Sequence, residues 1–307
     1  MNVQKKNKII LLSYLLLIMS ALFWSGNFFV GRIAGNLSIP PISLNFYRWL
    51  LALFILLPFT YNKLLINKYL VKKNILKISI LGITGITFFN SIVYYSLNHT
   101  YVINAVLMIS IIPVVIVLLS WIFFGDKINI KQIIGIPLSI FGVFLIITKG
   151  LDHAILNNLE FNKGDLWMLV AVVSWATYSV ILKKLPKDMP PDVLLVSITF
   201  CGLFFLFPGY IFEFFTKDAL KFTFINSSII LYVALFAGIL AFYCWNKAVS
   251  IVGPNISGLF LHLMPVFSSF LAVIFLGEIF VIHHILGVVF IILGILLTTY
   301  KNIFNQT

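Results

Sequence analysis

The sequence predicts an all-α integral membrane protein in which ten transmembrane helices form two five-helix repeats of opposite membrane orientation. Of the 307 residues, 61% are hydrophobic and 10% are charged, which is too apolar for the water-exposed surface of a soluble protein. Apolar stretches of about 20 residues, the length that crosses about 30 Å of hydrocarbon, recur along the chain. The second half also repeats the tryptophan, proline and glycine pattern of the first half.

Ten spans follow from the lengths of the apolar stretches and the polar residues between them. They cover residues 9–30, 42–59, 78–97, 102–124, 130–147, 164–182, 193–212, 227–247, 253–276 and 282–299. The first span runs beyond the apolar core of a signal peptide and shows no clear small-residue cleavage site. We therefore expect it to be retained as a helix.

The two halves align at an offset that stays between 148 and 152 residues. The matched pairs include Trp24 and Trp175, Pro58 and Pro208, Asn98 and Asn246, and Pro113 and Pro265. Because each half holds five spans, an odd number, the second copy enters the membrane from the opposite side, and the repeat is inverted. We assign residues 9–148 to the first repeat, 149–163 to a linker in an outer loop, and 164–300 to the second repeat.

Lysine and arginine positions predict the orientation, because cytoplasmic loops are enriched in them. With the N-terminus inside, fifteen of the 21 basic residues fall in inner segments and five in outer segments, and Arg48 lies within a span. Both termini are therefore predicted to be cytoplasmic, in a multi-pass protein of the cell (inner) membrane. The basic residues form short clusters between spans, which argues against nucleic acid as a partner.

Several short motifs resemble one family. They are the segment FWSGNFF around Trp24, Arg48 early in the second span, and GDKINIKQIIGIPLSIFGVFLII paired with GEIFVIHHILGVVFIILGILLTT. Together with the repeat, they resemble the drug/metabolite transporter superfamily, specifically EamA-type permeases with ten transmembrane helices, over nearly the whole chain. The resemblance implies a carrier of amino acids or other small metabolites, often an exporter, that works by alternating access between its halves.

Polar side chains deep in the spans are the candidates for a substrate site, because exposure to hydrocarbon costs several kcal/mol unless they are paired. Asn90 and His262 lie nearest the middle of their spans, where an inverted-repeat carrier places its substrate. The predicted substrate-binding residues are Asn90, His262, Tyr94, Trp175, Tyr178, Asn27 and Tyr243. For the asparagines and His262, the alternative is a hydrogen bond that joins neighbouring helices.

Arg48 retains its charge even inside a protein and needs either a partner or a route to water. Three roles are open for its side chain: snorkelling to the outer surface, fixing helix packing through carbonyl groups, or capturing a substrate carboxylate. Of these, the sequence favours a packing role.

Prolines and glycines repeat at equivalent positions and predict mechanical roles. Pro113 and Pro265 are expected to kink their helices, either as paired hinges or as static curvature. Two glycine pairs, each seven residues apart, are expected to form a packing face or the contact of a homodimer. These glycines are Gly135, Gly142, Gly287 and Gly294.

Missing features narrow the function. No carboxylate is predicted near the middle of a span, which disfavours exchange of protons for a cationic drug. The sequence has two cysteines and no hydrolase or metalloprotease motif, and the adjacent His283 and His284 diverge on a helix, so we expect no enzyme activity, cofactor or metal site. The predicted function is a secondary transporter of a small neutral or zwitterionic metabolite, an amino acid foremost, as exporter or exchanger. The alternatives are an efflux pump for drugs or other metabolites and, less favoured, a channel or a membrane-embedded enzyme.

Overall fold

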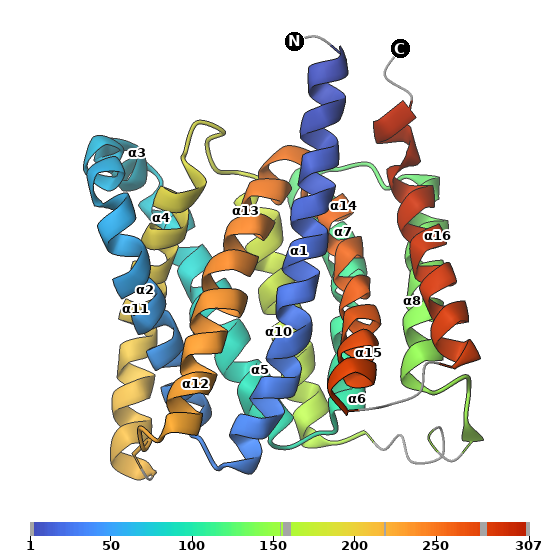
Figure 1. Ribbon diagram of the computed structural model, residues 1–307. Helices are drawn as coiled ribbons and strands as arrows, with labels where there is room; N and C mark the ends of the chain where they lie inside the picture. The colour runs from blue at the N-terminus through green and yellow to red at the C-terminus, as the bar shows by residue number, and fades with distance from the viewer. Residues whose placement is uncertain (1–2, 154, 156–160, 218, 277–280, 305–307) are drawn as a thin grey trace.

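The computed structural model describes residues 3–153, 155, 161–217, 219–276 and 281–304. Every regular element among these residues is helical, and the long helices lie side by side in one bundle (Figure 1). α1 (Val3–Asn36) begins and α16 (Ile282–Phe304) ends at the same end of the bundle, as an even number of crossings requires (Figure 1). The predicted all-α membrane fold is confirmed.

Further helices of the first half are α2 (Pro41–Ile66), α3 (Lys68–Lys73), α4 (Ile75–Leu81), η1 (Gly82–Phe88), α5 (Phe89–Leu97), α6 (Val102–Ile109), α7 (Ile112–Phe124) and α8 (Ile130–Ile147). In the second half, α16 is preceded by α10 (Lys163–Leu182), α11 (Pro191–Thr216), α12 (Phe224–Tyr232), η2 (Val233–Leu240), α13 (Ala241–Val252), α14 (Pro254–Leu259), η3 (Phe260–His262) and α15 (Leu263–Leu276). Among the described residues, nine helices have the length and hydropathy of a membrane span. The remaining predicted span, 253–276, consists of α14, η3 and α15 in direct succession.

Several helices extend beyond their predicted spans. α2 runs to Ile66 instead of residue 59, and α1 runs to Asn36 instead of residue 30. The sequence criterion measured the hydrocarbon core, whereas backbone hydrogen bonding continues into the headgroup layer. Arg32 consequently lies within α1, where Nη1 donates to Leu97 O at 2.6 Å. Two predicted segments lie partly outside the described residues. They are the linker, at 154 and 156–160, and the segment GEIFVIHHILGVVFIILGILLTT, at its first four residues, 277–280.

Irregular backbone recurs at equivalent positions of the two halves. The π-helical segments η1 and η2 interrupt the third and eighth spans, 151 to 152 residues apart. The fourth span breaks at Ser110 between α6 and α7, and the ninth narrows to the 3-10 turn η3, which ends at His262, 152 residues later. Each break lies just before a proline, whose missing N–H cannot continue the helical ladder. The duplication is therefore visible in backbone defects as well as in residue types.

The fifth and tenth spans, α8 and α16, pack directly on each other through glycines (Figure 1). A Cβ on Gly142 would lie 2.5 Å from Gly287 O, and a Cβ on Gly135 would lie 2.8 Å from Gly294 O. Only glycine permits this approach of the two backbones. The four predicted glycines therefore meet one another within a single chain, and a homodimer would have to use another surface.

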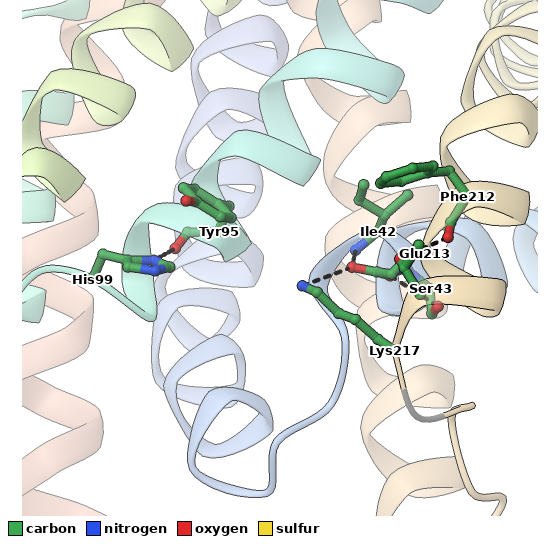
Figure 2. Close-up of polar contacts among 8 residues, drawn as sticks. Ile42, Ser43, Tyr95, His99, Phe212, Glu213 and Lys217 are labelled. Carbon is green, nitrogen blue, oxygen red and sulfur yellow. Dashed lines mark hydrogen bonds and ion pairs between the residues drawn. The ribbon is translucent and has the colours of Figure 1, made fainter.

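Helices α2 and α11 are joined at both ends by related contacts. At one end Glu213, buried near the end of α11, accepts hydrogen bonds from Ser43 N at 2.6 Å and Ser43 Oγ at 2.9 Å, and so caps the start of α2 (Figure 2). At the other end Lys63 forms an ion pair of 2.5 Å with Asp192 in the first turn of α11. Lys63 and Glu213 are 150 residues apart and therefore occupy equivalent positions in the two repeats. The same position thus joins α2 to α11 at each end.

Candidate functional site

Two small adjoining cavities lie between the halves at the centre of the bundle. The first, of about 20 Å³, is lined by residues that include Asn27, Asn90 and Trp175. The second, of about 10 Å³, is lined by residues that include Ser110 and His262. Both share wall residues from α1, α6 and the ninth span. Each volume holds about one water molecule, so the structure is closed around this site.

A hydrogen-bonded network of the first repeat backs the larger cavity. Arg48 Nη1 donates to Asn90 Oδ1 at 2.8 Å and to Tyr94 OH at 2.9 Å, and Tyr94 OH donates to Asn27 Oδ1 at 2.9 Å. Asn90 Nδ2 donates to Gly85 O at 2.8 Å, within the π-helical segment η1. The network joins α1, α2 and α5, and it holds the two asparagines that reach the cavity.

The hydrogen bond between Tyr94 and Asn27 has a counterpart in the second repeat, in which the tyrosine and the asparagine have exchanged positions. Tyr178 OH donates to Asn246 Oδ1 at 2.6 Å. At offsets of 151 and 152, Tyr178 matches Asn27 and Asn246 matches Tyr94. The tyrosine–asparagine bond is thus present in both halves, whereas the helix that carries each residue differs.

The charged part of the network has no counterpart. The positions equivalent to Arg48 and Asn90, at offsets of 150 and 152, are Ile198 and Phe242, both buried and apolar. The charged group and its amide partner are therefore confined to the first repeat, whereas the second repeat contributes His262 and Trp175 to the cavity walls.

Arg48 is fully buried, with no exposed surface. This excludes snorkelling to the outer surface. Its described acceptors are side chains rather than backbone carbonyls, which also excludes the carbonyl form of the packing role. The guanidinium lies over the Trp49 ring at 5.2 Å from the ring centroid.

Both ring nitrogens of His262 are engaged. Nε2 lies 2.9 Å from Ser110 O, and because a carbonyl only accepts, this nitrogen carries the proton. Nδ1 lies 2.6 Å from Ser139 Oγ. Val114 N, the regular helical partner of Ser110 O, donates instead to Ile111 O at 3.0 Å. His262 therefore satisfies a carbonyl that the break in the fourth span leaves without a helical partner.

Aromatic rings fill the space between the cavity and the second repeat. The Trp24 and Trp175 rings, equivalent in the repeat, meet edge to face at 5.1 Å between centroids. Trp175 stacks on Tyr178 at 4.9 Å and meets Phe242 at 5.3 Å and Trp245 at 5.6 Å. Through Trp24 and Trp175 this aromatic cluster forms part of the wall of the larger cavity.

The structure brings most of the predicted residues to one place. Asn27, Asn90, Trp175 and His262 line the cavities, whereas Tyr94 and Tyr178 are buried behind them. Tyr243 lies elsewhere: its half-buried ring faces the Lys247 ammonium at 5.8 Å. Sequence reasoning missed Phe242 and Trp245, although their spacing of three residues places them on one face of α13.

Carboxylates stay away from the centre in the described part of the chain. Asp165 is fully buried, but it lies in the first turn of α10 and accepts from Thr100 Oγ1 at 2.6 Å and Asn104 Nδ2 at 3.1 Å. Glu213 caps α2 at the same end of the bundle. The described polar groups at the cavities are thus amides, hydroxyls, indoles and an imidazole, with one guanidinium behind them.

The two broken helices are packed unequally along their lengths. α7 and α14 lie against each other, and a Cβ on Gly258 would lie 3.0 Å from Ile116 Cδ1 and 3.3 Å from Pro113 Cα. Among the described residues, α6 and α15 form at most an isolated contact, and the smaller cavity lies between them. The close contact of α7 with α14 lies toward the end of the bundle where α1 begins, and the α6 and α15 pair lies toward the other end (Figure 1).

Comparison with known proteins decides the family. The model of the EamA-like transporter family matches residues 11–148 and again residues 162–300. The chain belongs to the EamA-like transporter family. It is therefore a multi-pass membrane transporter of the drug/metabolite transporter superfamily and not an enzyme, as the sequence predicted.

Relatives of this EamA-type transporter carry general names. The uncharacterized transporter YetK of Bacillus subtilis (strain 168) is 29% identical over 71% of this chain and 66% of its own length, less than two thirds. An uncharacterized transporter of Archaeoglobus fulgidus is 27% identical over 94% of this chain and 98% of its own length. A protein crystal structure superposes with a TM-score of 0.75 over 96% of this chain and 99% of that one, at 16% identity, which shows that the fold is shared.

Proposed function

We propose that this EamA-type transporter is a secondary carrier for a small neutral or zwitterionic metabolite, an amino acid foremost, and that it works as an exporter or exchanger. The observation that carries this proposal is the chemistry of the central cavities. Their polar groups are amides, hydroxyls, indole and imidazole, and the described carboxylates lie at the ends of the spans. A cationic drug would need a buried carboxylate to replace its hydration.

Alternating access is supported by the unequal packing of the broken helices. In the opposite state, α6 would close onto α15 and α7 would separate from α14. The end of the bundle that is now tightly packed would then be open, and the cavity would lie between the two ends as before. The repeated breaks before Pro113 and Pro265 supply the bending points in this proposal. By the distribution of lysines and arginines, the end where α1 begins faces the cytoplasm.

A counterflow experiment tests the substrate class. Purified protein in liposomes loaded with an unlabelled pool of the twenty L-amino acids is expected to accumulate external labelled amino acids with saturation, and empty liposomes are the control. Saturable exchange separates a carrier from a channel. Accumulation of labelled cationic drugs, with no exchange of amino acids, would replace the proposal by the efflux-pump alternative.

A disulfide test addresses the mechanism. In a background where Cys201 and Cys244 are replaced by serine, the pair Ile116→Cys and Gly258→Cys joins α7 to α14. Oxidation is expected to abolish counterflow, and reduction is expected to restore it. Full exchange by the oxidised, cross-linked protein would refute a mechanism in which this contact opens.

A further inference from the structure

The core around the aromatic cluster contains a surplus of hydrogen-bond donors. Six buried N–H groups there have no partner among the described residues: Arg48 Nε, Arg48 Nη2, Trp49 Nε1, Trp175 Nε1, Trp245 Nε1 and Asn246 Nδ2. Two buried amide oxygens also have no hydrogen-bond partner among the described residues: Asn45 Oδ1 and Asn255 Oδ1. Buried donors are normally paired, so the group that completes this region is rich in acceptors.

These donors belong to one continuous set of contacts. The Arg48 guanidinium covers the Trp49 ring, Trp49 meets Phe242 at 4.8 Å, and Phe242 meets Trp175 at 5.3 Å. Trp175 in turn meets Trp245 at 5.6 Å and lines the larger cavity. The donor-rich region therefore begins at the cavity wall and ends at Arg48.

The repeat explains why Trp175 lacks a partner. Trp24, its equivalent, donates through Nε1 to Ala237 O in η2 at 3.0 Å. The acceptor equivalent to Ala237, at the same offset of 151, is Ile86 O, which receives Asn45 Nδ2 at 2.8 Å instead. One copy of the indole bond is satisfied, and the other leaves its donor available beside the cavity.

Arg48 provides the charge of this region. No carboxylate lies within ion-pair distance of it in the described part of the chain. A buried charge without a counter-charge is strongly destabilising, so an anion that reaches it is bound strongly. Nε–H and one Nη2–H point in the same direction along one edge of a guanidinium, which is the geometry that binds both oxygens of a carboxylate. The partnered nitrogen, Nη1, is the one outside this edge.

The free edge of the guanidinium is covered in this structure, because Arg48 has no exposed surface. It lies beside η2, where a Cβ on Gly238 would be 3.6 Å from Nε. Asn90 links the same guanidinium to the cavity, because its Oδ1 accepts from Arg48 and its side chain lines the wall. A ligand that separates η2 from α2 at Gly238 meets Nε and Nη2 directly.

We propose that Arg48 binds a carboxylate group of the transported substrate through its Nε and Nη2 edge, with unpartnered indole N–H groups of the aromatic cluster facing the rest of the molecule. This deepens the proposed function and rests on it, since it names carboxylate as the group by which substrate is recognised. One guanidinium balances one negative charge, which favours a carboxylate over a phosphate group of about −1.5 to −2.

Charge-matched competitors test the proposal on the unaltered protein. Three unlabelled probe pools share side chains: the twenty L-amino acids, their α-amides, and the corresponding acids without the amino group. Each is added to the counterflow assay and, separately, to detergent-purified protein whose tryptophan fluorescence is recorded. Both pools of carboxylates are expected to compete and to quench fluorescence, and the amides are expected to be at least roughly tenfold weaker, as for loss of a charged hydrogen bond. Amides that compete as well as the acids would overturn the proposal.

Variants locate the effect at Arg48. Arg48→Gln is expected to raise the KM for carboxylates at least roughly tenfold and to remove the preference for acids over amides, whereas Arg48→Lys, which keeps the charge without the two-pronged edge, is expected to fall between. Arg32→Gln is the matched control, since Arg32 donates to Leu97 O and lines neither cavity. An unchanged acid preference in folded Arg48→Gln contradicts the proposal.

The amino-acid assignment and carboxylate recognition by Arg48 are contradicted by different results. If acids without an amino group bind and are exchanged while amino acids are not, the amino-acid assignment fails and the role of Arg48 is supported. If amino acids and their amides are exchanged equally well, the amino-acid carrier stands and carboxylate recognition by Arg48 is overturned. The competition on unaltered protein gives this answer even if Arg48→Gln does not fold.

Discussion

Ser110 and His262, which occupy equivalent positions in the two repeats, are hydrogen bonded to each other across the centre of the molecule, with 2.9 Å between Ser110 O and His262 Nε2. The bond joins the break of the fourth span to the narrow turn of the ninth. It ties together the two places where the helical ladder is interrupted. A histidine that appeared from the sequence to be a ligand for substrate thus also stabilises the backbone beside the cavity.

Replacement of His262 by alanine is expected to lower the free energy of unfolding by about 2–4 kcal/mol, because it leaves Ser110 O unpaired and opens a void. Ser139→Ala, which removes only the partner of Nδ1, is expected to lower it by about 1 kcal/mol. Denaturant unfolding of the purified protein, followed by tryptophan fluorescence, measures both. Equal stability of the two variants would show that the bond to Ser110 contributes nothing.

Asn90→Asp is expected to weaken carboxylate binding at least roughly tenfold. The new carboxylate would lie at the position of Asn90 Oδ1, 2.8 Å from Arg48 Nη1, and would neutralise the guanidinium before substrate arrives. Asn246→Asp is the comparison, since the described partner of Asn246 is the neutral Tyr178, and the added charge is expected to destabilise the fold. Thermal unfolding measures the stability of each variant, and amino-acid competition measures its carboxylate binding. Normal carboxylate binding by Asn90→Asp would contradict the proposed role of Arg48.

Gly142→Ala is expected to destabilise the protein by about 1–3 kcal/mol, as overpacking does, because the new Cβ would lie 2.5 Å from Gly287 O. Gly209→Ala in α11 is the matched control, with its nearest contact at 3.7 Å from Ile42 Cγ2. There the better helix propensity of alanine is expected to leave stability unchanged or raise it by up to about 1 kcal/mol. Thermal unfolding in one detergent compares them, and equal shifts would mean that α8 and α16 adjust without strain.

Glu213→Ala is expected to lower the free energy of unfolding by about 1–3 kcal/mol, because it leaves buried donors of Ser43 unpaired. Its repeat counterpart, Lys63→Ala, is expected to change it by less than about 1 kcal/mol, since the Lys63 side chain is 59% exposed and its ion pair with Asp192 is solvated. Raising the salt concentration should reduce the Lys63 effect by the larger fraction, because the Glu213 effect comes mainly from its hydrogen bonds to Ser43 and less from its ion pair with Lys217. A larger loss of free energy of unfolding in Lys63→Ala than in Glu213→Ala would contradict this prediction.

Much of the fold was predictable because a bilayer imposes a coarse rule: only a long apolar helix can cross it. The fifth span, 130–147, coincides with α8. The ends of α1 and α2 were less predictable, because helical hydrogen bonding does not stop where apolar residues do. The π-helical segments η1 and η2 were not predictable from residue types, since their carbonyl groups have partners on other helices, such as Ser174 Oγ on Thr84 O and Trp24 Nε1 on Ala237 O.

The site was predictable in kind and less so in detail. Polar residues deep in apolar spans have to meet one another or line a cavity, and Asn27, Asn90 and His262 do so. The sequence gives no direct sign that Arg48 bonds to Asn90, because the two residues lie on different helices. The sequence pattern paired Asn246 with Asn98 at an offset of 148, whereas the offset of 152 that relates Asn90 to Phe242 places Asn246 opposite Tyr94.

The small volume of the central cavities has a bioenergetic consequence. A passage closed down to spaces of about 20 and 10 Å³ has room for isolated waters and none for a continuous file of them. Within the described part of the chain, neither of these two spaces offers protons or sodium ions a continuous file of waters. We therefore expect a carrier in this closed form to leave the ion gradients of its membrane intact.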